Sequence, residues 1–168
     1  MIDTNRLILR KFTDSDLDAY YQIMKEKSVY QWLGKGGQRT KEHVLKTIEY
    51  YKKHWIQYGI GNFAVYLKDK NELIGHCGFN CIDELGGFEL LYALSEDHWY
   101  KGYASEASIA CLEWLEKQGS LSKVYALSYP DNHRSIHVIE KLNFIYIGNK
   151  HLFGVDLRAF ELNFQSRH

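Results

Sequence analysis

Residues 88–107 read FELLYALSEDHWYKGYASEA and contain the transition that decides the fold. Residues 88–94 are almost unbroken apolar sequence, which predicts a strand buried on both faces of a sheet. Further along, Ala107, Cys111 and Leu115 recur at helical spacing until Gly119, which predicts an amphipathic helix. A buried strand that leads through a tight turn into a helix is typical of an α/β protein.

The sequence before this stretch predicts two helices and several short strands. Residues 7–10 alternate as in an opening strand, Thr13 and Asp16 resemble a helix start, and Thr40 can cap a second helix. Residues 63–67 and 73–82 read as strands that a polar turn separates, and residues 83–87 read as a hairpin loop.

The sequence after it predicts a strand at 124–129, a short helix at 135–142 and late strands at 144–147 and 155–164. The order implies a mixed sheet, antiparallel early, with a strand–helix–strand unit in the middle. One α/β domain over residues 1–168 is expected, because one proline, no linker and no repeat leave no boundary. Apolar side chains of the last strand, Phe160, Leu162 and Phe164, suggest pairing in a homodimer.

Charge balance, hydropathy and cysteine count exclude several classes of protein from the expectation. Lys plus Arg equals Asp plus Glu at 21 each, so no overall field directs the chain to nucleic acid or to an acidic membrane. No run of residues approaches a membrane span and no signal core opens the chain, so we expect a cytoplasmic protein. Three cysteines form no disulfide framework, and Cys77 and Cys81 lack a second ligand pair, so no metal is expected.

The turn at residues 99–107 has features of a phosphate site. The first turn of a helix offers free N–H groups and the positive end of the helix dipole. Gly102 lets the backbone approach a ligand, Ala104 keeps the next turn small, and Lys101 adds a cation. An ordinary tight strand–helix turn would explain these residues about as well.

Four segments in this order resemble the GNAT superfamily of N-acetyltransferases, in the branch of the ribosomal-protein N-terminal (RimJ/RimL-like) acetyltransferases. They are TNRLILRKFTDSDLDAYYQI, ELIGHCGF, FELLYALSEDHWYKGYASEA and NHRSIHVIEKLNF, and together they cover nearly the whole chain. The resemblance implies an acyl-CoA N-acyltransferase fold, with a central, mostly antiparallel mixed sheet flanked by helices, and acetyl-CoA as co-substrate. It assigns cofactor contacts to Leu94, Trp99, Tyr100, Lys101, Gly102, Tyr103, Ala104 and Asn132.

The chain departs from the family pattern at four positions. Trp99 replaces the usual Gln or Arg, and Tyr100 stands where this branch often has Gly. Many relatives have a Tyr seven residues after the Asn that corresponds to Asn132, as the acid for the coenzyme A thiolate, and here that position is Ile139. Ser135, one helical turn from Asn132, is the substitute that the branch suggests. Asn143 stands where Gly is usual, and Asn tolerates the left-handed backbone.

Transfer of an acetyl group to an amine requires a polarised carbonyl and an acceptor of the amine proton. By resemblance, the backbone N–H near Leu94 binds the thioester carbonyl, a role that can contribute about 3 kcal/mol. Glu89 is the only charge in the apolar strand and the candidate base. Pairing of Glu89 with a cation on the next strand is an equally good reading, and Asp83, Glu84 and His76 are lesser candidates.

The acceptor stays open at this stage. A protein α-amino group is the leading hypothesis, and a small amine such as an aminoglycoside or a polyamine is the second. The acidic residues Asp83, Glu84 and Glu89 lean slightly toward a cationic acceptor. A third hypothesis, of another class, is a non-catalytic acyl-CoA sensor on the same scaffold.

Overall fold

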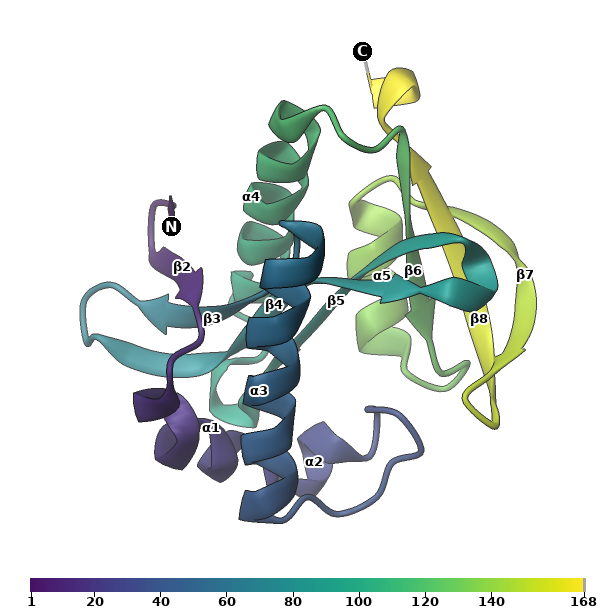
Figure 1. Ribbon diagram of the computed structural model, residues 1–168. Coiled ribbons are helices and arrows are strands. Elements are labelled where there is room, and N and C mark those ends of the chain that lie inside the picture. The colour runs from purple at the N-terminus through teal and green to yellow at the C-terminus, as the bar shows by residue number, and fades with distance from the viewer. Residues whose placement is uncertain (168) are drawn as a thin grey trace.

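A single eight-stranded sheet forms the centre of the computed structural model, which describes residues 1–167 (Figure 1). The strand order is β1-β2-β3-β4-β5-β6-β8-β7, and every neighbouring pair is antiparallel except β5 and β6. The strands are β1 (Ile2–Asp3), β2 (Leu7–Lys11), β3 (Asn62–Leu67), β4 (Glu72–Ile82), β5 (Gly87–Leu94), β6 (Lys123–Ser128), β7 (Ile145–Leu152) and β8 (Val155–Asn163). The predicted mixed, mostly antiparallel sheet is confirmed.

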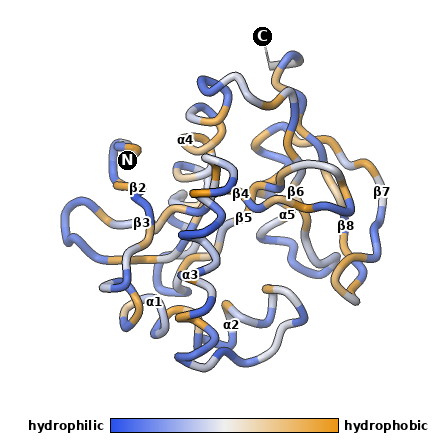
Figure 2. The backbone as a smooth tube through the Cα atoms, viewed as in Figure 1, coloured by the Kyte–Doolittle hydropathy of each residue, from blue (hydrophilic) through white to orange (hydrophobic). Residues whose placement is uncertain are grey.

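Helices cover both faces of this sheet. The helices α1 (Leu17–Met24), α2 (Lys27–Tyr30) and α3 (Lys41–Tyr58) precede the long strands, and α4 (Tyr103–Gln118) and α5 (His133–Lys141) follow β5 and β6. One core cluster joins α1 and α3 to one sheet face, and a larger cluster joins α4 and α5 to the other. Hydrophobic colour follows the central strands, whereas the β3–β4 turn is hydrophilic (Figure 2).

Alternation along the strands decides which face each side chain occupies. Glu89 pairs with Asn80, and Ala93 pairs with His76, whose ring contacts Tyr20 of α1. Residues 89, 91 and 93 of β5 therefore face α1 and α3, and residues 90, 92 and 94 face α4 and α5. We call these the α3 face and the α4 face.

The predicted helices and their ends are largely confirmed. Thr40 caps α3, since its hydroxyl accepts the His43 N–H at 3.2 Å, and α4 ends at Gly119 in the left-handed region. Asn143 also adopts a left-handed backbone, with φ of 68°. Cys77 and Cys111 are buried in the core. Across residues 1–167, no helix is both long and apolar enough to cross a membrane.

Two expectations about the strands were wrong. In β5 only Leu90 and Leu94 are fully buried, and the other residues are half-buried, because the strand borders an open cavity instead of a packed layer. The strand β8 lies between β6 and β7, and Phe160, Leu162 and Phe164 are 0 to 5% exposed inside the core. These three side chains therefore cannot pair across a dimer.

Candidate active site

The site begins where the parallel strands β5 and β6 separate. They pair only at Glu89 with Tyr125 and at Leu90 with Ala126. Beyond these pairs, residues 91–94 of β5 and 127–129 line a common cavity between them. A crevice at the carboxyl ends of parallel strands is the usual ligand position in such a sheet.

The direction of the β5 backbone follows from one hydrogen bond. The Ser95 N–H donates to the Ile74 carbonyl of β4 at 2.8 Å. Because backbone groups alternate sides along a strand, the N–H groups of Leu94 and Tyr92 point away from β4, toward the gap. The Leu94 carbonyl also points away from β4, since it accepts the Trp99 indole N–H at 2.8 Å. The peptide N–H groups of Leu94 and Tyr92 therefore face the cavity, and binding of the thioester at Leu94 stays a prediction.

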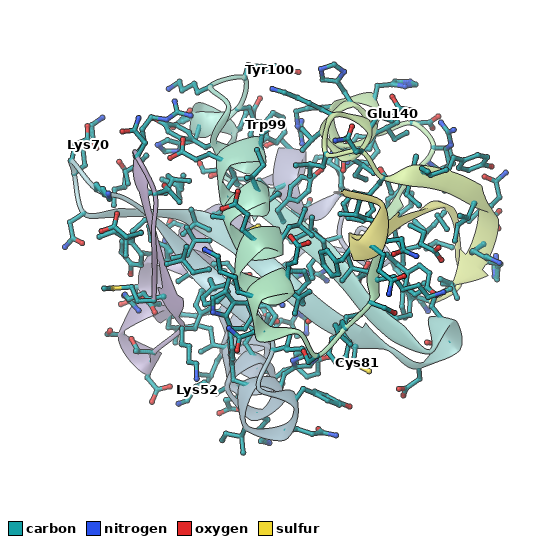
Figure 3. All side chains as sticks on the ribbon, turned by 90° about the horizontal axis from the view of Figure 1, so that it is seen from above. Lys52, Lys70, Cys81, Trp99, Tyr100 and Glu140 are labelled. Carbon is teal, nitrogen blue, oxygen red and sulfur yellow. The ribbon has the colours of Figure 1, made fainter. Side chains whose placement is uncertain are left out.

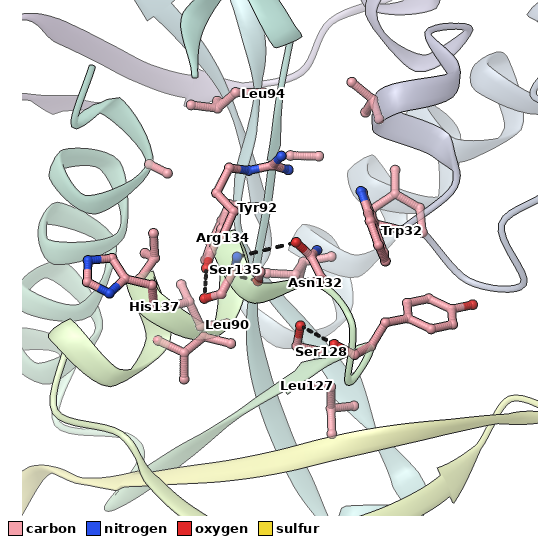
Figure 4. A pocket seen from close by; sticks show the side chains of 18 of the residues that line it. Trp32, Leu90, Tyr92, Leu94, Leu127, Ser128, Asn132, Arg134, Ser135 and His137 are labelled. Carbon is pink, nitrogen blue, oxygen red and sulfur yellow. Dashed lines mark hydrogen bonds between the residues drawn. The ribbon is translucent and has the colours of Figure 1, made fainter. Parts of the chain in front are cut away.

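The cavity has a volume of about 690 Å³ and reaches both faces of the sheet (Figure 4). On the α4 face it is lined by the start of α4 and by α5. On the α3 face it is lined by Val29 of α2, by residues 32–34 after it, and by the β7–β8 turn. It is therefore long enough to hold two reactants that meet in the gap between β5 and β6.

The N-terminus of α4 opens into this cavity. Gly102 precedes the helix with φ of 81°, a left-handed conformation that favours glycine. The first helical bond runs from the Glu106 N–H to the Gly102 carbonyl at 3.0 Å, so the amides of residues 103–105 have no helical acceptor. Residues 102–105 line the cavity, and their N–H groups with the helix dipole suit a diphosphate.

Trp99 and Arg134 form a stacked pair at the cavity wall. The Arg134 guanidinium carbon lies 3.2 Å from the centre of the Trp99 ring, and both residues line the cavity. Partial burial lowers the pKa of Arg134, although the guanidinium stays charged. Among the described residues, Arg134 has no carboxylate partner within ion-pair distance. Trp99 therefore holds the half-buried Arg134 guanidinium against the same cavity wall as the free amides of residues 103–105.

Of two further predicted cofactor contacts, Lys101 lies outside the cavity lining and Tyr100 lies at its mouth. Lys101 does not line the cavity, because its ammonium donates to the Asp97 carbonyl at 2.9 Å. Tyr100 borders the cavity mouth, but its side chain is 87% exposed at the periphery of the molecule (Figure 3). Its φ of 60° lies in the left-handed region that favours glycine.

A hydroxyl pair lies on the α4 face beside the gap. Ser135 Oγ is 3.2 Å from the Tyr92 hydroxyl, which also lies 3.1 Å from the Ser135 carbonyl. Asn132 accepts the Ser135 N–H through its side chain at 3.3 Å and caps α5 (Figure 4). Burial raises the pKa of Tyr92 far above that of an ordinary phenol. Ile139, which stands at the position of the expected acid Tyr, is buried in the core. The paired hydroxyls of Tyr92 and Ser135 are therefore the candidate proton donors in its place.

Glu89 stands on the α3 face at the point where the strands begin to separate. It is half-buried and lines the cavity, and burial raises the pKa of its carboxyl to about 8. Its cross-strand neighbours are Asn80 and Tyr125, and it forms no ion pair within the part of the chain that the structure describes. The alternative reading, in which Glu89 pairs with a neighbouring cation, is therefore wrong.

The lesser candidates are not brought to the cavity. His76 is 1% exposed, its Nδ1 lies 2.7 Å from the Tyr20 hydroxyl, and burial lowers its pKa to about 4. Asp83 and Glu84 are exposed on the turn between β4 and β5 and do not line the cavity. His76 is therefore a neutral core histidine, and Glu89 is the one carboxylate that lines the cavity among residues 1–167.

Sequence reasoning did not single out Tyr92, Arg134 or Trp32. Tyr92 shares the parity of Leu90 and Leu94, so the alternation of β5 could have revealed it. Arg134 and Trp32 had no such signal, because their roles depend on contacts across more than 30 residues of sequence, with Trp99 and with Tyr129.

Comparison with known proteins identifies the class. A family model described as an acetyltransferase (GNAT) domain matches residues 6–145, so the chain belongs to the GNAT acetyltransferase family and is an acyltransferase. It is similar to the uncharacterized N-acetyltransferase p20 of Bacillus licheniformis, at 30% identity over 142 residues that cover 84% of this chain and 80% of the relative.

Solved structures share the fold along nearly the whole chain. A GNAT-family acetyltransferase from Bacillus anthracis superposes with a TM-score of 0.82 at 26% identity, covering 96% of this chain and 97% of the other. RimL, a ribosomal L7/L12 α-N-protein acetyltransferase in complex with coenzyme A, superposes with a TM-score of 0.80 at 22% identity, covering 95% of each chain. The predicted family is confirmed, and members of this family use acetyl-CoA.

Proposed function

We propose that this acetyltransferase moves the acetyl group of acetyl-CoA to a primary amine by direct attack while both reactants are bound. The observation that carries the proposal is a cavity through the sheet, with free helix amides on the α4 face and, among residues 1–167, a single lining carboxylate on the α3 face. Each end matches one reactant, because amides favour a diphosphate and a carboxylate favours an ammonium.

In this proposal the chain holds acetyl-CoA on the α4 face. The amides of residues 103–105 bind the diphosphate, and the Arg134 guanidinium beside Trp99 adds a second charge-assisted contact. Asn132 contacts the pantetheine arm, and the N–H groups of Tyr92 and Leu94 bind the acetyl oxygen as negative charge develops there.

Glu89 then accepts the proton that the amine must lose. A carboxylate with a pKa near 8 is a stronger base than an ordinary one, because burial favours its uncharged acid form. The amine nitrogen forms a bond to the acetyl carbon, and the bond from that carbon to sulfur breaks. The Ser135 hydroxyl, hydrogen-bonded to Tyr92, supplies a proton to the leaving thiolate and regains one from solvent, to which Glu89 releases the proton of the amine.

The test is product identification. The protein is incubated with acetyl-CoA and a mixed library of amines and peptides, and acetylated products are identified by mass spectrometry. We expect one class of amine to gain an acetyl group in step with release of free coenzyme A thiol. Binding of acetyl-CoA with no product across the whole library would contradict the proposal and favour a non-catalytic acyl-CoA sensor.

A further inference from the structure

The part of the cavity on the α3 face is almost entirely apolar. Its floor comes from β5, β6 and β8, and strand alternation assigns Leu91, Ala93, Leu127, Tyr129 and Leu157 to the same face as Glu89. Its roof comes from α2 and the residues after it, namely Val29, Trp32 and Leu33. We call this space the acceptor chamber.

The acceptor chamber contains one acidic side chain among the described residues. Glu89 is the only carboxylate among the described residues that line the cavity, and the cavity-lining cations Arg134 and Lys141 lie in α5, which covers the α4 face. A polyamine or an aminoglycoside carries several ammonium groups, and each one that enters an apolar site needs its own counter-charge. The exposed Asp83 and Glu84 lie outside the lining and cannot supply it.

The far end of the chamber is closed by the segment after α2. The Tyr129 hydroxyl donates to the Gly34 carbonyl, and the Trp32 and Tyr129 rings meet edge to face at 6.0 Å. The next residue, Lys35, lies beside the β7–β8 turn, where a β-carbon on Gly154 would be 3.4 Å from Lys35 Cε. A polypeptide that presents its N-terminus to Glu89 needs a path out of the chamber for the rest of its chain, and this aromatic wall blocks the path beside α2.

We infer that the acceptor is a small primary amine with a single ammonium group on an apolar or aromatic body, such as an arylalkylamine. The inference rests on the proposed transfer to an amine and specifies its substrate class. The ammonium lies at Glu89, and the apolar body fills the space between Trp32, Leu157 and Tyr129. The inferred acceptor differs from that of RimL, which acts on the ribosomal protein L7/L12.

The experiment compares three acceptors in a thiol-release assay with saturating acetyl-CoA. 2-Phenylethylamine represents the inferred class, spermidine represents polycations, and the peptide Ser-Ala-Ala-Ala represents a protein terminus. We expect kcat/KM for 2-phenylethylamine to exceed both others at least about 30-fold, the effect of burying one ring. A larger kcat/KM for spermidine or for the peptide would overturn the inference and leave acetyl transfer to an amine intact.

A variant of the roof tests the position of the apolar body. Trp32→Ala should raise KM for 2-phenylethylamine about tenfold more than it raises KM for methylamine, which has no apolar body. Tyr146→Ala, which removes an exposed ring from β7 outside the cavity, is the matched control and should change neither value. Equal losses for both amines in Trp32→Ala would overturn the inference.

If no amine is acetylated, a direct binding measurement tests the acceptor chamber independently of catalysis. Calorimetry would then titrate 2-phenylethylamine into protein saturated with coenzyme A. Saturable binding that Trp32→Ala weakens would uphold the acceptor chamber and refute the transfer. Absence of binding would overturn the inference itself.

Discussion

Burial of the Glu89 carboxyl affects both the pH dependence of folding stability and the proposed proton transfer. This carboxyl lines the cavity without a cation within ion-pair distance among the described residues, and burial raises its pKa from 4.5 to about 8. The folded protein therefore holds this proton more tightly than the unfolded chain does. The stability that this proton contributes is complete below the ordinary carboxyl pKa and is lost as pH rises through about 8.

Glu89→Gln should separate these two effects. Because Gln does not ionise, the free energy of unfolding of the variant relative to the wild type should grow by roughly 2 to 4 kcal/mol between pH 5 and pH 9. The same variant should lose about 100-fold in kcat/KM above pH 8, where the wild-type base is ionised. Urea unfolding and steady-state rates at several pH values check both effects. Unchanged activity across the range would remove Glu89 as the base.

Ser135 is expected to act on the leaving thiolate more than on binding. Ser135→Ala removes the hydroxyl and leaves the N–H that Asn132 accepts, so the cap of α5 persists. We expect kcat to fall about tenfold and the dissociation constant of acetyl-CoA to stay within about twofold, because a thiolate is a good leaving group. Stopped-flow rates and calorimetry measure the two quantities, and a wild-type kcat would clear Ser135 of the acid role.

Arg134 should act on cofactor affinity. Arg134→Ala removes a half-buried guanidinium that faces no carboxylate, and the dissociation constant of coenzyme A should rise about tenfold, with a weaker dependence on salt. Arg158→Ala is a matched control, since Arg158 also stacks on a ring, that of Tyr146, but lies outside the cavity lining. Equal affinity losses in both variants would mean that Arg134 acts only through folding.

At the scale of the element, the start of α4 carries the cofactor site. Gly102 and Gly119 flank this helix with φ of 81° and 65°, so a bulky residue strains the backbone at either end. Only Gly102 lines the cavity. Gly102→Val should therefore raise the dissociation constant of coenzyme A at least about 30-fold, whereas Gly119→Val should reduce stability alone.

Calorimetry and thermal melting distinguish these outcomes. A folded Gly102→Val variant with wild-type cofactor affinity would refute the position of the diphosphate. A loss of affinity in Gly119→Val as large as that in Gly102→Val would mean that helix stability, and not the free amides, determines binding.

Sequence patterns were informative where the physics is local. The helices α3 and α4 were predictable because caps such as Thr40 and Gly119 and an apolar stripe lie within each segment. The prediction failed for burial of β5, because an unbroken apolar strand looks the same whether helices or an open cavity cover it. The site residues also divide into local and non-local signals. Glu89 was predictable because it is a charge in an apolar strand, whereas the Trp99–Arg134 stack depends on tertiary contact.

At the scale of the whole molecule, one topological feature makes the site. A mostly antiparallel sheet contains a single parallel pair, β5 and β6, and this pair separates after two residue pairs. The separation gives a path through the sheet, so a donor from the α4 face can meet an acceptor from the α3 face. The exposed edge strands are β1 and β7, which excludes a dimer built on the internal strand β8.

The central claim is that free amides at residues 103–105 hold the diphosphate of a coenzyme A thioester. Calorimetry with acetyl-CoA and with S-acetylpantetheine, which has the same thioester arm without the diphosphate and its phosphoadenosine, tests it most directly when Gly102→Val is measured beside the wild type. We predict that acetyl-CoA binds at least about 100-fold more tightly, the difference of roughly 3 kcal/mol expected from two or three charge-assisted contacts. Equal affinities for the two compounds, or no heat with either one, would contradict the account.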